Sequence, residues 1–225
     1  MNLTKVMSEA GDLLLAGLWV TIQITVVSLI LAVILGIVIC FFRISKVKPL
    51  QWLAKLYLLI LRGTPILVQI FFIYFGLPQL VQSLGIDFRF TAFSGGVVAL
   101  TLNAGAYLSE IFRGGIQAVD YGQTEAARSL GLSKTRTMIK VILPQAFKIS
   151  LPAVSNQFII TLKDTSLVSV ISLGEIVYQA KIYIGRTMES FSTWALVGLM
   201  YLVIITVLTE LLNILEKRVN YGRKG

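Results

Sequence analysis

The sequence of 225 residues contains no histidine and a single cysteine, Cys40. Without histidine it lacks the commonest general base and metal ligand, so we expect no metal site in this chain. One cysteine cannot form a disulfide within the chain. No G-x-x-x-x-G-K-[ST] segment is present either, which argues against nucleotide hydrolysis through a P-loop. We therefore expect no cofactor in this chain.

Charge is also scarce. Charged residues make up 14% of the sequence, whereas soluble domains contain about 25%. Hydrophobic residues account for 56%, and the mean hydropathy is +0.82. This composition is typical of an integral membrane protein. No Gly/Ser/Pro-rich linker divides the chain, so we expect one transmembrane domain over residues 1–225.

Charged residues separate five apolar segments that are long enough to cross a bilayer, which needs roughly 20 mostly apolar residues. We expect spans at about 13–42, 56–82, 90–112, 150–176 and 190–214. The fold class is then all-α, an integral membrane helical bundle with about five transmembrane helices. Because five is odd, the two termini lie on opposite faces of the membrane.

Lys and Arg residues are concentrated in three segments, 43–62, 113–148 and 217–224. Cytoplasmic loops carry an excess of these residues, so the C-terminus is expected inside and the N-terminus outside. The first apolar run is too long for a signal peptide, and we expect it to be retained. The net charge of +9 is explained by this topology and by contact with anionic lipid, without a nucleic-acid partner.

A polar loop at 120–148 separates the third and fourth spans. Asp120 followed by Gln123 has the form of a capping box, and Gly131 suits a left-handed position at a helix end. Ser133 can cap a second helix, and Pro144 is expected to stop it. The loop is thus predicted to form a helix, a glycine turn and another helix.

On the first of these helices, Ala126, Ala127 and Leu130 are expected to share a face of small and medium side chains that another surface could approach closely. Glu125 is the acidic residue at this point, and we expect it to complement the helix N-terminus. The alternative is a simple connector that lies on the lipid headgroups, with its basic residues near phosphate.

Two polar stripes mark a possible path through the membrane. Asn103, Tyr107 and Glu110 recur at helical spacing on the third span. On the fourth span Asp164 lies beside a stripe of hydroxyl and amide side chains: Gln157, Thr161, Thr165, Ser169 and Ser172. An ionisable group inside a membrane normally faces a bundle interior or a wet cavity. Alternatively, Asp164 neutralises Lys163 and has a structural role.

These residues leave three classes of function open. The polar stripes could belong to a permease driven by a separate ATPase, or to a secondary transporter or channel for small polar solutes. Glu110 and Asp164 could instead form the carboxylate pair of an intramembrane enzyme. No Gly-x-Gly-Asp motif typical of aspartyl membrane proteases is present.

The polar loop resembles a known family motif. Glu125-Ala126-Ala127, Gly131 and Val141-x-Leu143-Pro144 match the EAA loop of bacterial ABC importer permeases, with Val141 where isoleucine is usual. Three other segments are similar to the polar amino acid uptake subfamily: Arg62-Gly63-Thr64-Pro65, Asn103 to Gly115, and Lys163 to Leu167. In the first of these, Thr64 and Pro65 are expected at the N-cap and first position of a helix, which would bend the second span.

The resemblance implies a transport subunit of the prokaryotic inner membrane. Its partners would be ABC ATPase subunits that bind ATP and Mg, a second permease subunit of the same or a paralogous kind, and an extracytoplasmic binding protein. The substrate would be a polar or basic amino acid such as arginine, histidine or glutamine. Five residues would form the coupling helix that contacts the ATPase: Glu125, Ala126, Ala127, Leu130 and Gly131.

Overall fold

The computed structural model describes residues 3–220, and in this range the chain is helical with no strand. The elements are α1 (Leu3–Ile44), α2 (Lys48–Gly63), α3 (Ile66–Phe71), α4 (Leu77–Ser83), α5 (Ala92–Gln117), α6 (Tyr121–Ser129), α7 (Lys134–Thr137), α8 (Leu143–Asp164), α9 (Ile176–Thr187) and α10 (Ser190–Asn220). Two π-helical turns, Phe72–Gly76 and Met138–Ile142, and a 3₁₀ segment, Thr165–Ile171, join some of them. The expected all-α fold is confirmed. Of the basic residues expected at the C-terminal end, Arg223 and Lys224 lie outside the described range.

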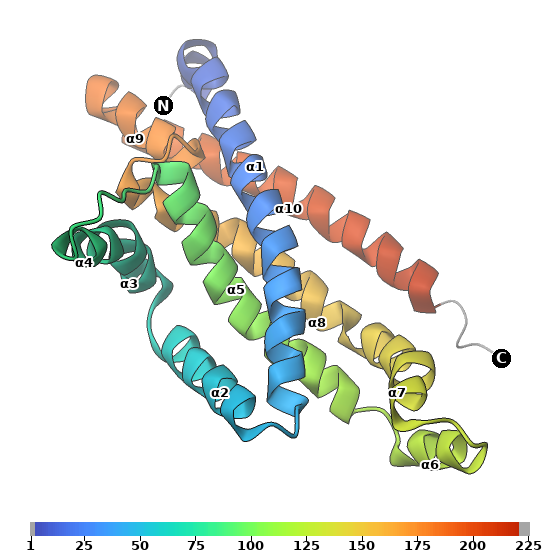
Figure 1. Cartoon of the computed structure of the whole chain (residues 1–225). Helices are drawn as coiled ribbons and strands as arrows, with labels where there is room; N and C mark the ends of the chain where they lie inside the picture. The colour runs from blue at the N-terminus through green and yellow to red at the C-terminus, as the bar shows by residue number, and fades with distance from the viewer. Residues whose placement is uncertain (1–2, 221–225) are drawn as a thin grey trace.

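Helix α1 runs the length of the molecule and packs against α5 in the centre of the bundle (Figure 1). Its buried side includes small residues every three or four positions: Gly17, Thr21, Thr25, Ser28, Ala32 and Gly36. Small residues let helix backbones approach closely, which is how helices associate in lipid. At Gly36, a Cβ atom would lie 2.9 Å from the Cβ of Leu108 on α5. The α1–α5 contact therefore depends on a missing side chain.

Four helical stretches are long and apolar enough to cross a membrane: Leu3–Ile44, Ile66–Ser83, Lys134–Ile171 and Ser190–Val219. The expected third span corresponds to α5, a helix of 26 residues at the centre of the bundle. The expected second span is divided, because α2 ends at Gly63 and α3 begins at Ile66. The predicted break is thus present, but Pro65 occupies the N-cap position and Thr64 caps the end of α2.

Pro144 does not stop a helix, contrary to the prediction. The chain continues from α7 through the π-helical turn into α8, and Pro144 lies in the first turn of α8. The wider π turn changes the hydrogen-bond register before the proline, with the Leu143 N–H donating to the Met138 carbonyl. A proline within a first helical turn removes a donor that has no intrahelical partner. The helix can therefore pass through Pro144 unbroken.

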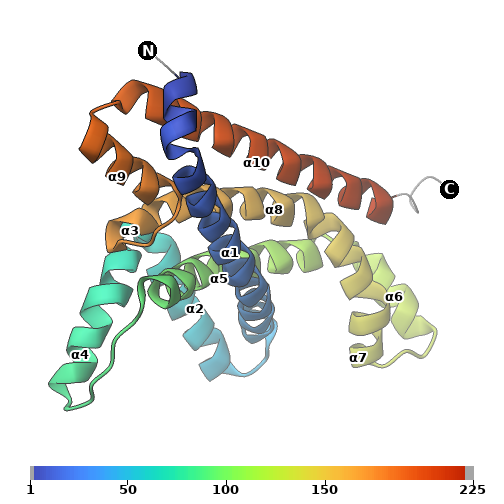
Figure 2. The same ribbon diagram turned by 90° about the horizontal axis from the view of Figure 1, so that it is seen from above.

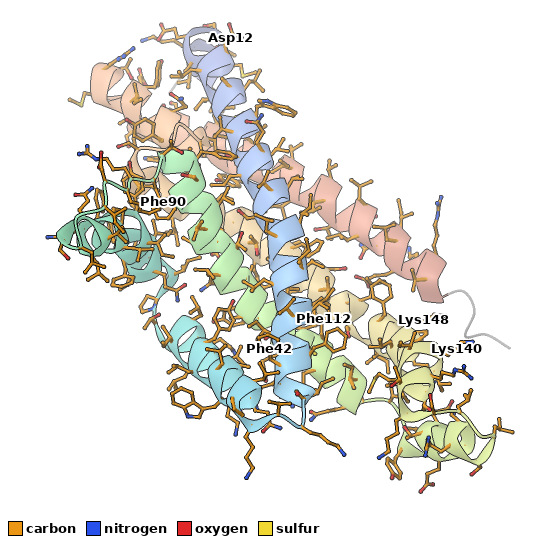
Figure 3. All side chains as sticks on the ribbon, viewed as in Figure 1. Asp12, Phe42, Phe90, Phe112, Lys140 and Lys148 are labelled. Atoms are coloured by element: carbon orange, nitrogen blue, oxygen red, sulfur yellow. The ribbon has the colours of Figure 1, made fainter. Side chains whose placement is uncertain are left out.

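The loop helices and the first turns of α1 lie at opposite ends of the bundle. Figure 3 shows Asp12 near one end of α1 and the side chains of Lys140 and Lys148 near the other end, beside α6 and α7. Seen from above, α10 extends along the side of α8, while α2 and α4 lie on the other side of α1 (Figure 2). The described part of the chain thus has a basic end that carries the polar loop.

Candidate transport cavity and coupling loop

A cavity of about 320 Å³ opens where three distant segments meet. Its lining residues come from the α2–α3 break, from α5 and from α8: Thr64, Pro65, Ile66, Asn103, Tyr107, Gln157, Ile160 and Asp164. The two predicted polar stripes do face the same space, since α5 packs against α8. The break between α2 and α3 supplies the third wall, which the stripes alone did not indicate.

Asp164 is the acidic residue of this cavity. Its side chain is half-buried, and its carboxylate makes no hydrogen bond or ion pair with the described residues. Neighbouring Lys163 is exposed and forms no ion pair with it. The alternative in which Lys163 neutralises Asp164 is therefore not what the structure shows. A carboxylate without a protein partner at a cavity wall can accept a cationic group from a ligand.

Asn103 connects the cavity wall to the helix break. Its amide nitrogen donates to Oε1 of Gln69 at 2.9 Å, and Gln69 Nε2 donates to the carbonyl oxygens of Leu61 at 2.8 Å and Thr64 at 2.9 Å. Gln69 is buried. These bonds satisfy carbonyl groups that the end of α2 leaves without intrahelical partners. The sequence analysis missed Gln69, although an amide four residues after Pro65 in an apolar helix was a usable signal.

The stripe of hydroxyl and amide side chains on the fourth span lies partly in the cavity and partly in the core. Thr161 and Thr165 are buried, with exposures of 1% and 0%, and their hydroxyls donate to the carbonyls of Gln157 and Leu162 on their own helix. They do not line the cavity, whereas Gln157 does. A threonine in a helix can satisfy its hydroxyl on the preceding turn, so it can pack like an apolar residue.

Glu110 lies in a different environment from Asp164. Its carboxylate accepts two hydrogen bonds from Arg113, at 2.7 and 3.1 Å, while Arg43 and Arg62 approach at 3.8 Å. Glu110, Arg43 and Arg62 border a second hollow of about 410 Å³, whose lining does not include Asp164. The two carboxylates therefore do not form a pair within one cavity, which removes the geometric basis for an intramembrane carboxylate enzyme.

The polar loop forms the predicted helix, turn and helix. Ser133 caps α7 by accepting from the Arg136 N–H, and Gly131 has a φ of +83° in the turn. Asp120 caps α6 but accepts from the Gly122 N–H at 2.6 Å. The Gln123 side chain accepts from Gln145 on α8, so the expected capping box does not form. This contact ties the loop to the start of a transmembrane helix.

The expected common face of α6 is corrected by the structure. Ala127 is 4% exposed, while Leu130 is 84% exposed and Glu125 and Ala126 are exposed as well. Ala127 turns inward because the chain after Gly131 folds back over it, with the Leu132 N–H donating to the Ala127 carbonyl. The surface that α6 offers is thus formed by Glu125, Ala126 and Leu130.

Comparison with known proteins identifies the family. Residues 28–221 match the family described as binding-protein-dependent transport system inner membrane component. The arginine transport system permease protein ArtQ of Bacillus subtilis is 40% identical over 205 residues, which cover 91% of each chain. The probable glutamine ABC transporter permease protein GlnM of the same organism is 38% identical over 90% of this chain and 91% of its own.

Solved structures agree with this assignment. An amino acid ABC transporter crystallised with histidines matches with a TM-score of 0.86 and 39% identity, over 94% of this chain and 96% of that one. The MetNI methionine ABC transporter, at 17% identity and a TM-score of 0.75, shares the fold. The chain therefore belongs to the family of inner membrane components of binding-protein-dependent transport systems, and it is a multi-pass membrane permease subunit of the ABC transporter type.

Proposed function

We propose that this permease carries a polar or basic amino acid through the cavity at Asp164, in an importer driven by separate ATPase subunits. The observation that carries this proposal is the unpaired Asp164 carboxylate in a cavity that also presents the side-chain amides of Asn103 and Gln157. Amino acids are the cargo named for the relatives at about 40% identity. A small cation with hydrogen-bonding groups fits this set of side chains.

Each wall of the cavity has a distinct part in this proposal. Asp164 attracts the ammonium or guanidinium group of the substrate through a charge-assisted hydrogen bond. The amides of Asn103 and Gln157 offer both donors and acceptors. Ile66 and Ile160 provide apolar surface for the methylene groups of the substrate side chain. Glu110 does not contact the substrate in this scheme, because Arg113 already occupies its carboxylate.

The energy enters through the polar loop. Glu125, Ala126 and Leu130 form the surface that docks on the ATPase, and the partner ATPase binds ATP and Mg. The turn at Gly131 and the inward-facing Ala127 hold α6 in place, and the bond from Gln145 to Gln123 passes its movement to α8. An extracytoplasmic binding protein delivers the substrate at the opposite end, where α1 begins, and a second permease subunit completes the passage.

Uptake by the reconstituted complex tests this function. Proteoliposomes containing the permease, its ATPase and the binding protein should accumulate labelled arginine or glutamine only when ATP is present. Asp164→Asn keeps the size of the side chain but removes its charge. We expect arginine uptake to fall about 10- to 100-fold, the effect of losing one charge-assisted hydrogen bond, and glutamine uptake to fall less. Lys163→Gln is the matched control, and we expect it to change neither.

Uptake without ATP would contradict the ATP-driven reading and favour a secondary transporter. If Asp164→Asn and Lys163→Gln have equal effects on the uptake of arginine and of glutamine, Asp164 is not part of the substrate path. The orientation has its own test, in which a cysteine at Gly85 or Gly131 is labelled with an impermeant reagent. Gly131 should react only from the cytoplasm and Gly85 only from outside, and labelling of both from one face rules out this topology.

A further inference from the structure

Arg62 borders the second hollow, next to the transport cavity, and has unused hydrogen-bonding capacity. Its guanidinium is 5.4 Å from the ring centroid of Tyr107, whose side chain lines the cavity. Two residues further along the chain, Thr64 lines the same cavity. The Arg62 side chain is 44% exposed and makes no hydrogen bond with the described residues. An arginine carries five N–H donors in a fixed fork that matches a carboxylate.

Glu110 does not use this capacity. Arg113 already binds its carboxylate through two hydrogen bonds, of which the shorter is 2.7 Å. Arg62 and Arg43 each stay 3.8 Å away, beyond hydrogen-bond distance. Three arginines thus surround one carboxylate, so the hollow beside the cavity carries a surplus of positive charge. That surplus attracts a further anionic group.

We infer that Arg62 binds the α-carboxylate of the transported amino acid, with the substrate lying between Arg62 and Asp164. This inference rests on the proposed function and deepens it, because it assigns both charges of a zwitterion. The cavity then recognises any α-amino acid at Arg62, and it discriminates among side chains nearer Asp164. Tyr107 positions Arg62 by holding the guanidinium over its ring face.

The geometry favours Arg62 over the other cations of the cluster. Arg43 and Arg62 are equally distant from Glu110, and both border the second hollow. Arg113 is committed to Glu110 and also donates to Gln117 at 2.7 Å. Of these three arginines, Arg62 is the one that lies over a ring of the cavity wall, that of Tyr107. Arg43 therefore serves as a matched control that shares the ion-pair cluster and the hollow but not the contact with Tyr107.

Ligand binding to the purified permease–ATPase complex tests this assignment. Omitting the binding protein removes that protein's own selectivity for amino acids. The probes are L-arginine, L-histidine and L-glutamine, each compared with its decarboxylated analogue, namely agmatine, histamine and 4-aminobutanamide. For the wild type, loss of the carboxylate should weaken binding about 10- to 100-fold, as expected for a charge-assisted bond.

Arg62→Gln should abolish this preference, so that each analogue binds as tightly as its amino acid, while Arg62→Lys keeps part of it. Arg43→Gln should leave the preference unchanged. If Arg62→Gln and Arg43→Gln reduce the preference for the amino acid over its analogue equally, Arg62 acts only through the Glu110 cluster and the inference fails. It fails equally if the wild type does not distinguish the analogues. An uptake assay in which wild type transports amino acids, with Asp164 required, shows that the proposed function survives such a result.

Discussion

The polar loop at 120–148 and the cavity at Asp164 are built in opposite ways. The loop is one continuous segment, in which caps and a left-handed glycine at Gly131 fix the conformation locally. The cavity draws its walls from three segments that are far apart in the sequence, joined by the bond from Asn103 to Gln69 across 34 positions. The loop can therefore be altered without moving the helices beside it, whereas the cavity cannot.

This difference separates two kinds of mutational effect. Changes in the loop should affect partner docking while the spans remain stable, because α6 has few buried side chains. Changes around the cavity should alter stability and ligand binding together, because the groups that line it also hold α2, α5 and α8 in position. Three variants test this separation, beginning with the largest expected effect.

Gln69→Ala should be the most damaging. It removes the partner of the Asn103 amide and leaves the carbonyls of Leu61 and Thr64 without their side-chain donor. Each buried polar group left unsatisfied costs about 1–3 kcal/mol. We expect a large fall in the thermal stability of the complex together with loss of substrate binding. Stable protein with altered binding would show that the break is held by other contacts. Gln82→Ala, whose amide bonds an exposed carbonyl of Phe88, is the control.

Gly115→Ala should have a smaller effect, at the junction between the two regions. A Cβ atom there would collide with Oγ of Ser150 and lie 2.8 Å from the carbonyl oxygen of Ala146, both on α8. Overpacking of this kind costs about 1–3 kcal/mol. At neighbouring Gly114 a Cβ would meet nothing within 4 Å. Thermal melts should therefore show a lower unfolding midpoint for Gly115→Ala and an unchanged midpoint for Gly114→Ala. Equal midpoints for the two variants would mean that α5 and α8 can separate without cost.

Gly131→Val should have the smallest effect on stability but a clear effect on coupling. A Cβ atom at this position would meet nothing within 4 Å, so the strain comes only from the φ of +83°. The left-handed conformation costs a residue with a Cβ roughly 1–2 kcal/mol. This cost lowers the population of the loop conformation that docks by about 5- to 30-fold. Substrate-stimulated ATP hydrolysis should fall by that factor. Gly131→Asn tolerates this conformation and should retain most of the activity.

The sequence was sufficient for features that depend on neighbours along the chain. Composition indicated membrane helices, and the glycine turn and the Ser133 cap followed from rules that operate within one or two turns. The same rules were wrong at Pro144, where a π-helical turn lets α8 begin at the proline. They also placed Ala127 on the exposed face, because its burial depends on how the following turn folds back.

The cavity could be predicted only in part. Helical spacing put Asn103 and Tyr107 on one face of their helix and Gln157 and Asp164 on another, and both faces do line the cavity. Spacing could not separate Thr161 from that set, because a hydroxyl that bonds its own backbone packs in the core as readily as it lines a cavity. Nor could it place Glu110 outside the cavity, since the hollow that Glu110 borders is formed with residues of two other helices, α1 and α2.

By itself, the sequence determined that this chain crosses the membrane as helices and carries a polar loop with a fixed turn. Hydropathy and backbone conformation act over a few residues, so both can be deduced from the order of amino acids. The tertiary structure alone decided that the α2–α3 break, Asn103 and Asp164 surround one space, and that Arg62 lies over the ring of Tyr107 in its wall. Periodicity defines the face of a single helix, but the rotation of helices against one another is set by packing among distant side chains such as Gln69 and Gly36.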